Sequence, residues 1–250
     1  MKIVFVPDIH GDIKFIERIE SDYSTWNKIF VGDLVDSFEF TRTEQFECVK
    51  KVISMIEKGD TQCIFGNHEL SYLYPTMRAS GYAGTMNTLL SPLKSKIKKL
   101  FKNYVYFYPE RILITHAGLT KYIYNQFDFS LENINGTFEE WSKSPIKETP
   151  LGWIGKIRGG TNTIGGPFWC DWNNEFQPTE GLNQVFGHSA YVDTHKDLES
   201  GIRKQEIFTE VLGQKKVCNG INYNIDCLLH EKIEILELTN KIFSIKNYDN

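Results

Sequence analysis

The chain has 250 residues, a formal net charge of −4 and 41% hydrophobic residues, enough for one domain with a full hydrophobic core. This balance argues against a dedicated nucleic-acid-binding surface, which would show as an excess of lysine and arginine. The five cysteines form no CxxC pair and cannot close into a complete disulfide set. The apolar run at the N-terminus is too short for a signal peptide or a membrane span. We therefore expect a cytoplasmic protein that is not attached to a membrane.

Five short apolar runs along the chain each end in a polar residue. Each run has the length of a buried strand, and the runs lead to Asp8, Asp33, Asn67, His116 and His188. Between the first three runs, apolar residues recur at helical spacing over 15–19 and 46–56. Strands that alternate with helices predict an α/β fold with crossover helices. In such a fold, ligands bind beyond the carboxyl ends of the strands.

The rest of the chain predicts a further helix, an insertion and a last group of strands. Residues 84–102 read as helix, and its part KSKIKKLFK has one apolar stripe with lysines around it. From about residue 120 to 182 the composition changes to asparagine, glycine, proline and tryptophan, with four of the five tryptophans. We expect this segment to be an irregular insertion in a single domain of residues 1–250, either a satellite core or a wall of a substrate groove. The later segments NYNID, KIEILEL and KIFSI resume strand patterns.

The first two polar strand ends carry carboxylates and one imidazole. In PDIHGD, Asp8 and His10 lie two residues apart, so both side chains can point to the same side of an extended segment. A carboxylate and an imidazole together suit a first-row divalent metal. The motif GDLVD then adds Asp33 and Asp36.

The remaining strand ends add an amide and further imidazoles. The motif GNHE supplies Asn67 and His68, and an asparagine ligand makes sense mainly for an oxygen-accepting ion beside a bridging carboxylate. His116 in THAGL and His188 in FGHS complete a ligand set suited to zinc, iron or manganese. We expect the glycine before each ligand to let the backbone turn sharply at the strand end.

The succession DIHGD, GDLVD, GNHE, THAGL and FGHS closely resembles the calcineurin-like metallophosphoesterases, and within them the phage-type and eukaryotic serine/threonine protein phosphatases. The motifs run in the family's order over residues 8–188. The resemblance implies a two-sheet mixed β-sandwich flanked by helices. It also implies two divalent metal ions, with manganese expected and iron or zinc as alternatives.

The same resemblance implies a role for each matching residue. Asp33 would bridge the two metal ions. The first ion would be held by Asp8, His10 and Asp33, and the second by Asp33, Asn67, His116 and His188. His68, oriented by Asp36, would protonate or stabilise the leaving-group oxygen.

The implied activity is hydrolysis of phosphate monoesters by in-line attack of a metal-bridging hydroxide. The substrate would be a phosphorylated protein, a nucleotide or another small phosphate ester. A phosphodiesterase or dinucleoside-polyphosphate hydrolase of the same superfamily stays open as an alternative. A second alternative is a non-catalytic module that binds a phosphorylated ligand.

The arginines of the phosphatase branch are absent from this sequence. Ser37 and Phe38 stand where Arg-Gly follows GDxVD, Phe65 precedes GNHE, and the FWCD stretch has no arginine beside it. The arginines that could replace them from other positions are Arg42, Arg78, Arg111 and Arg158. The preference for a dianionic monoester therefore depends on where these side chains lie.

Overall fold

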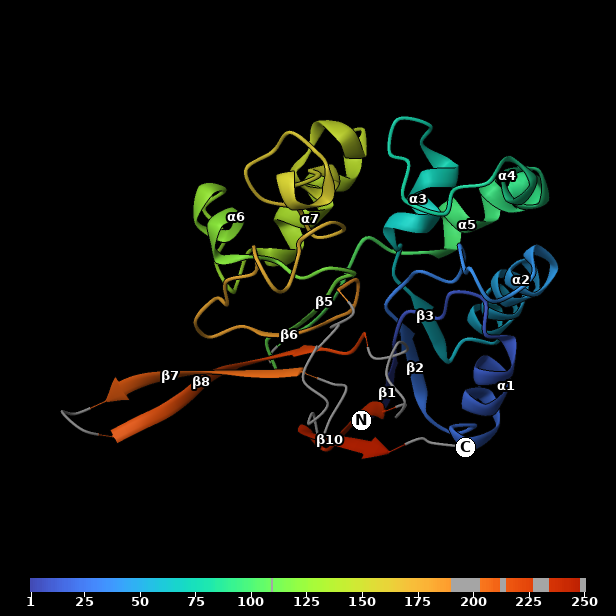
Figure 1. Cartoon of the computed structure of the whole chain (residues 1–250). Helices are drawn as coiled ribbons and strands as arrows, with labels where there is room; N and C mark the ends of the chain where they lie inside the picture. The colour runs from blue at the N-terminus through green and yellow to red at the C-terminus, as the bar shows by residue number, and fades with distance from the viewer. Residues whose placement is uncertain (109, 190–202, 212–214, 227–233, 248–250) are drawn as a thin grey trace.

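The computed structural model describes residues 1–108, 110–189, 203–211, 215–226 and 234–247. They form two five-stranded sheets, with helices beside the first sheet and above both (Figure 1). The strand orders are β10-β9-β1-β2-β3 and β4-β5-β6-β8-β7. Two mixed sheets with flanking helices confirm the fold class expected from the sequence.

The first sheet is parallel on one side and antiparallel on the other. Strands β1 (Lys2–Val6), β2 (Asn27–Phe30) and β3 (Thr61–Cys63) are parallel to one another. Strand β9 (Glu234–Thr239) is antiparallel to β1, and β10 (Ile242–Asn247) is antiparallel to β9. The parallel strands are joined by crossover helices, so their carboxyl ends lie at one edge of the sheet.

Each crossover helix begins at a side-chain cap. In α1 (Ile13–Asp22), the Asp12 carboxylate accepts a hydrogen bond from the backbone N–H of Phe15 at 2.9 Å. Helix α2 (Arg42–Lys58) begins with a capping box between Thr41 and Glu44. These caps begin both helices directly after the loops that carry the first site motifs.

The second sheet supplies three further parallel strand ends. Strands β5 (Ile112–Ile114), β6 (Asn183–Phe186) and β8 (Lys215–Asn224) are parallel, with β4 (Val105–Phe107) and β7 (Arg203–Val211) antiparallel at the two edges. The pair β7 and β8 extends well beyond the body of the molecule (Figure 1).

The segment 84–102 is helical over Gly84–Leu100, as expected, but its helix is divided. Helix α3 (Asn67–Leu73) follows β3, and the later segment is divided into α4 (Gly84–Leu90), a 3-10 turn η1 (Ser91–Leu93) and α5 (Lys94–Leu100). The division falls at a proline, Pro92, which has no backbone N–H and would clash with the preceding turn of a continuous α-helix.

The segment from about 120 to 182 contains more regular structure than expected. It holds α6 (Lys121–Gln126), α7 (Ile134–Lys143) and the 3-10 turns η2 (Ile146–Glu148), η3 (Pro150–Gly152) and η4 (Lys156–Arg158). Its residue Trp141 has its ring 5.1 Å from that of Phe129 and 5.5 Å from that of Phe138. All three belong to the same hydrophobic cluster as the central strands, so this part of the segment joins the main core and is not a satellite core.

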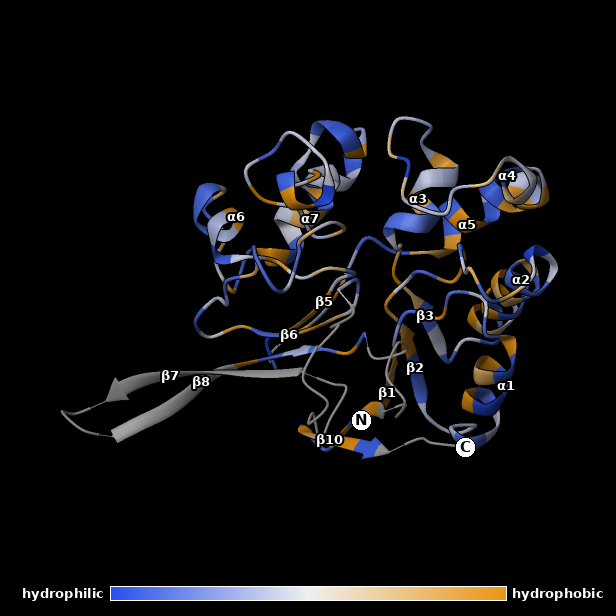
Figure 2. Cartoon of the chain, viewed as in Figure 1, coloured by the Kyte–Doolittle hydropathy of each residue, from blue (hydrophilic) through white to orange (hydrophobic). Residues whose placement is uncertain are grey.

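The central strands are fully buried. Val4, Phe5 and Val6 of β1 are 0% exposed, and the inward faces of α1 and α2 lie over the same sheet (Figure 2). Within the part of the chain that the structure describes, no helix combines the length and apolar character needed to cross a membrane.

Candidate metal centre

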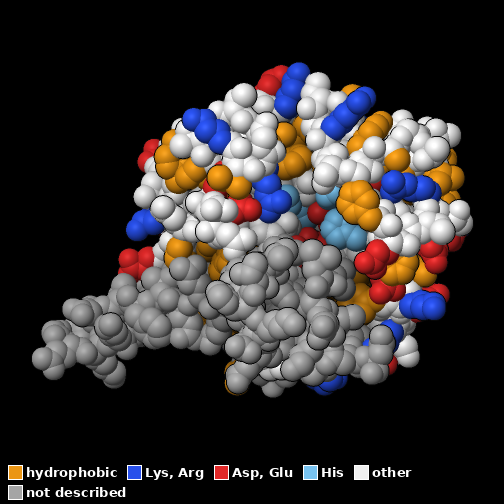
Figure 3. Space-filling view, viewed as in Figure 1, with side chains coloured by type: hydrophobic (Ala, Val, Ile, Leu, Met, Phe, Trp, Pro, Cys, Tyr) orange, Lys and Arg blue, Asp and Glu red, His pale blue; other side chains and the backbone are white. Residues whose placement is uncertain are grey.

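The five polar strand ends lie where the two sheets meet. Asp8, Asp33 and Asn67 follow β1, β2 and β3, while His116 and His188 follow β5 and β6. Figure 3 shows histidine side chains and carboxylates gathered in a hollow of the surface. The structure therefore brings together residues that are up to 180 positions apart in the chain.

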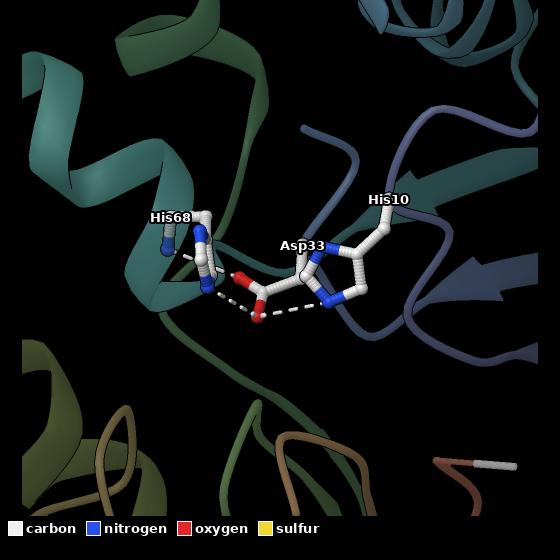
Figure 4. A group of neighbouring side chains, drawn as sticks. All are labelled: His10, Asp33 and His68. Carbon is white, nitrogen blue, oxygen red and sulfur yellow. Dashed lines mark hydrogen bonds and ion pairs between the residues drawn. The ribbon is translucent and has the colours of Figure 1, made fainter. Parts of the chain in front are cut away.

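Asp33 lies at the centre of this group. Two sets of side chains place their ligand atoms within 4.8 Å of one another: His10, Asp33 and His68, and Asp33, His116 and His188. The Oδ2 atom of Asp33 is 3.9 Å from His10 Nε2 and 3.3 Å from His116 Nε2. Figure 4 shows the imidazoles of the first set facing the Asp33 carboxylate from two sides. Because both sets share Asp33, its carboxylate is suited to bridge two cations.

The other two predicted ligands complete these sets. Asn67 Oδ1 lies 2.9 Å from His116 Nε2 and 3.0 Å from His188 Nδ1. Asp8 Oδ2 accepts a hydrogen bond from the backbone N–H of His188 at 2.7 Å, while its buried Oδ1 atom has no hydrogen-bond partner among the described residues. A buried carboxylate oxygen without a partner is costly, and a cation would satisfy it.

Backbone carbonyls fix which nitrogen of two histidines can bind a metal. Nδ1 of His10 lies 2.8 Å from the carbonyl of Val35, and Nδ1 of His116 lies 2.8 Å from that of Val31. A carbonyl only accepts, so each Nδ1 donates and each Nε2 keeps its lone pair. Both Nε2 atoms face Asp33, as a metal site requires.

The site carries an excess of buried negative charge. Burial raises the pKa of Asp8 well above its ordinary value, and the neighbouring carboxylates of Asp226 and Asp33 raise it further. Burial and the charge of Asp33 also raise the pKa of Glu69 to about 7. Divalent cations would relieve this repulsion, so the residues present fit the ligand set of a dinuclear metal site.

His68 is held against a buried carboxylate. Its Nδ1 atom lies 2.9 Å from Asp36 Oδ2, and the Tyr72 hydroxyl donates to the other oxygen of Asp36. Burial lowers the pKa of His68, but Asp33 and the hydrogen bond to Asp36 outweigh it and raise the pKa to about 9. Its Nε2 atom points toward Asp33 at 3.8 Å. The pair therefore presents a protonated imidazole to the centre of the site at neutral pH.

His188 has the opposite electrostatic environment. Burial lowers its pKa well below the ordinary value, and electrostatic interactions with His116 and Arg158 lower it further. A neutral imidazole is the form that binds a metal. His188 is therefore ready to act as a ligand without losing a proton first.

Strained backbone conformations occur at four site residues. His10, Asp33, Asp36 and His188 have φ values of 45°, 51°, 68° and 72°, a left-handed region that residues other than glycine rarely adopt. Such strain is concentrated at functional sites, where the surrounding structure holds it.

The expected role of the preceding glycines is correct only in part. Gly32 has a φ of 108°, which permits the sharp turn before Asp33. Gly66 and Gly187 do not have positive φ, and they are needed for close approach instead. A Cβ atom on Gly66 would lie 2.0 Å from Asp33 Oδ1, and one on Gly187 would lie 2.3 Å from Asp8 Oδ1.

Sequence reasoning assigned no role to two buried acids of the site. Asp226 follows β8 and its charge acts on Asp8, and the same strand-end pattern in NYNID could have revealed it. Glu69 Oε2 accepts hydrogen bonds from the backbone N–H groups of Asp33 and Gly66, both at 2.9 Å. No sequence pattern indicates this role of Glu69, because it depends on how β2 and β3 lie side by side.

Comparison with known proteins agrees with this geometry. A family model described as calcineurin-like phosphoesterase matches residues 1–191. The chain belongs to this family. Members of the calcineurin-like phosphoesterase family hydrolyse phosphoric esters and use divalent metals, so the chain is an enzyme of that class, as its motifs led us to expect. No curated protein matches the sequence.

Solved structures resemble this phosphoesterase in fold. A cold-active protein tyrosine phosphatase superposes with a TM-score of 0.57 at 14% identity, covering 98% of this chain and 78% of that chain. A metallophosphoesterase from Sphaerobacter thermophilus gives a TM-score of 0.51 at 11% identity, covering 100% of this chain and 89% of that chain. At these identities the likeness concerns the fold alone.

Proposed function

We propose that this calcineurin-like phosphoesterase hydrolyses phosphate monoesters at a dinuclear metal centre built around Asp33. The observation that carries the proposal is that the Asp33 carboxylate lies between two imidazoles, with its Oδ2 atom 3.9 Å from His10 Nε2 and 3.3 Å from His116 Nε2. Phosphorylated proteins, nucleotides and other small phosphate esters are the proposed substrates.

The proposed ligands keep the assignment made from the motifs. Asp8, His10 and Asp33 would hold one ion, and Asp33, Asn67, His116 and His188 would hold the other. Mixed carboxylate, amide and imidazole donors suit manganese, with iron or zinc as alternatives. Two ions bound here would supply a hydroxide nucleophile near neutral pH and neutralise the phosphoryl oxygens.

His68 is proposed as the group that protonates the leaving oxygen. This role requires a protonated imidazole next to the reacting phosphorus, and the pKa of His68 is raised to about 9 beside Asp36. Asp36 would hold the ring orientation and the tautomer through its 2.9 Å contact with Nδ1. Tyr72, which donates to Asp36, would fix the carboxylate in turn.

Two further features belong to the proposal. The chain would act as a single domain of residues 1–250, with the segment of about 120–182 inserted between the motifs that supply His116 and His188. We also propose that the enzyme works in the cytoplasm, which fits its buried, unpaired cysteines Cys48, Cys63 and Cys170.

An ester screen tests the proposal. The protein is treated with a chelator, reloaded with manganese, zinc or iron, and assayed on para-nitrophenyl phosphate and its bis ester. We expect metal-dependent turnover with a preference for the monoester. A preference for the bis ester would favour a phosphodiesterase instead. Tight binding of a phosphopeptide without turnover of any ester would favour the non-catalytic module.

A further inference from the structure

The guanidinium of Arg158 is fixed beside the candidate metal centre. Arg158 ends the turn η4, and its Nη2 atom lies 2.9 Å from Asp171 Oδ2 and 2.8 Å from Ser189 Oγ. Ser189 directly follows His188 and is only 2% exposed, and its hydroxyl also accepts the backbone N–H of Trp172 at 3.1 Å. The cation is therefore anchored to the segment that carries a proposed metal ligand.

Asp171 is held in place by contacts other than the one with Arg158. Its Oδ1 atom accepts backbone N–H groups of Asn173 and Asn174, at 3.1 Å and 2.9 Å, and the side-chain amide of Asn174 at 2.8 Å. Its Oδ2 atom remains for Arg158. Asp171 lies in the FWCD stretch, where the sequence supplies an acid and no arginine. The acid thus attracts a guanidinium that comes from a distant turn.

Arg158 keeps donors that its present partners do not use. A guanidinium has five N–H donors, and the contacts of Nη2 account for two of them. The Nε atom is buried without a partner, and no acceptor for Nη1 occurs among the residues that the structure describes. The side chain is 30% exposed, and it is bonded to Ser189, the residue after the proposed ligand His188. Fixed guanidinium donors beside a solvent-accessible hollow suit the oxygens of a phosphoryl group.

The other candidate arginines have different surroundings. Arg78 lies over the ring of Tyr82 at 4.8 Å, and Arg111 is an exposed residue in the turn before β5. Arg42 lies on the His68 side of the site, where its Nη1 atom donates to Gln45 at 3.0 Å. Among these four arginines, only Arg158 is anchored next to a proposed metal ligand on the second sheet.

We propose that Arg158, positioned by Asp171 and Ser189, binds the non-bridging oxygens of a dianionic phosphate monoester. The inference rests on the proposed function and names the substrate charge that the site prefers. A monoester dianion carries one more negative charge than a diester, and it offers an extra terminal oxygen for a bidentate contact. Removing Arg158 should therefore weaken the binding of monoesters and of inorganic phosphate much more than the binding of diesters.

The experiment compares Arg158→Gln and Arg158→Lys with wild type, and uses Arg111→Gln as the matched control. We measure kcat and KM on para-nitrophenyl phosphate and its bis ester, the inhibition constant of inorganic phosphate, and bound metal per chain. For Arg158→Gln we expect about a 10- to 100-fold rise in the monoester KM and in the phosphate inhibition constant. The KM for the bis ester should change by about threefold or less, and the metal content should not change. Arg158→Lys should fall between, because it keeps the charge and loses the planar fork.

Other results would overturn the inference. An unchanged phosphate inhibition constant, or equal losses on both esters together with lost metal, would show that Arg158 only supports the fold around His188. Should wild type turn over no ester at all, the proposed function fails. Titration calorimetry of inorganic phosphate on metal-loaded wild type and Arg158→Gln then decides the inference separately, and equal affinities would refute it.

Discussion

The Nδ1 atom of His68 lies 2.9 Å from the Oδ2 atom of Asp36, and both side chains are buried. The contact joins the loop after β2 to the start of α3. Because the carboxylate favours the protonated imidazole, the pair keeps a proton available beside Asp33 at neutral pH.

Replacement of His68 by asparagine should lower kcat by about 10²- to 10⁴-fold, the usual contribution of a placed proton donor. Metal content should stay close to that of wild type, since the proposed ligands remain. In Asp36→Asn, the pKa of His68 should fall by about one unit, moving the alkaline limb of the rate profile toward lower pH. Metal analysis and pH–rate profiles check both expectations, and metal loss in the His68 variant equal to that of an Asp33 variant would contradict its assignment.

The shared carboxylate makes Asp33→Asn a sharp test of the dinuclear centre. The affinity for both ions should fall at the same time, and turnover should disappear. The loss of affinity should exceed the about 10- to 100-fold loss that follows removal of a residue that only hydrogen-bonds to a ligand. Asp128→Asn is the matched control, because Asp128 is exposed and has a φ of 48°, close to the 51° of Asp33. Metal per chain after dialysis gives the result. Loss of one ion with retention of the other would refute the bridge.

The metal-free protein should lose stability as the pH rises from about 6.5 to about 9. The pKa of His68 is about 9 in the fold and ordinarily 6.5, so the folded state binds the extra proton in this window. The contribution of this proton to the free energy of unfolding is complete below pH 6.5 and is lost as the pH rises through about 9. Its upper limit is about 3 kcal/mol. Urea denaturation of chelator-treated protein at several pH values measures the slope. His68→Asn should flatten it, and an unchanged slope would place its origin elsewhere.

Gly187→Ala should damage the site without altering any ligand. The added Cβ would lie 2.3 Å from Asp8 Oδ1, so Asp8 or the backbone of His188 must shift. We expect a stability loss of about 1 to 3 kcal/mol and weaker metal binding. Gly136→Ala is the control, because nothing lies within 4 Å of its Cβ position in α7. That helical substitution should raise stability by about 0.5 to 1 kcal/mol. Calorimetry and metal titration separate the two variants.

The strand-end residues could be predicted because the rule behind them is local. A buried run followed by a polar residue fixes both a strand and the position of its last side chain, and this placed Asp8, Asp33, Asn67, His116 and His188 correctly at strand ends. That these residues meet follows from the parallel arrangement of the strands. Their roles as ligands stay a prediction.

What sequence reasoning missed depends on contacts between distant segments. The anchoring of Arg158 by Asp171 and Ser189 requires the folded path of the segment between β5 and β6, which has no periodic pattern to predict it. The support of Asp33 by Glu69 needs the lateral spacing of two strands. Asp226 could have been predicted from the sequence, since it follows its strand as Asp8 does, but we interpreted the segment only as a strand.

The division of the ligands between the two sheets has a consequence for folding. Asp8, Asp33 and Asn67 stand on the first sheet, and His116 and His188 stand on the second. An intermediate in which only the first sheet has formed lacks His116 and His188, and one with only the second sheet lacks the other four ligands, so either should bind ions weakly. High-affinity metal uptake is then a property of the fully assembled molecule, and the rate at which it appears during refolding would report when the two halves dock.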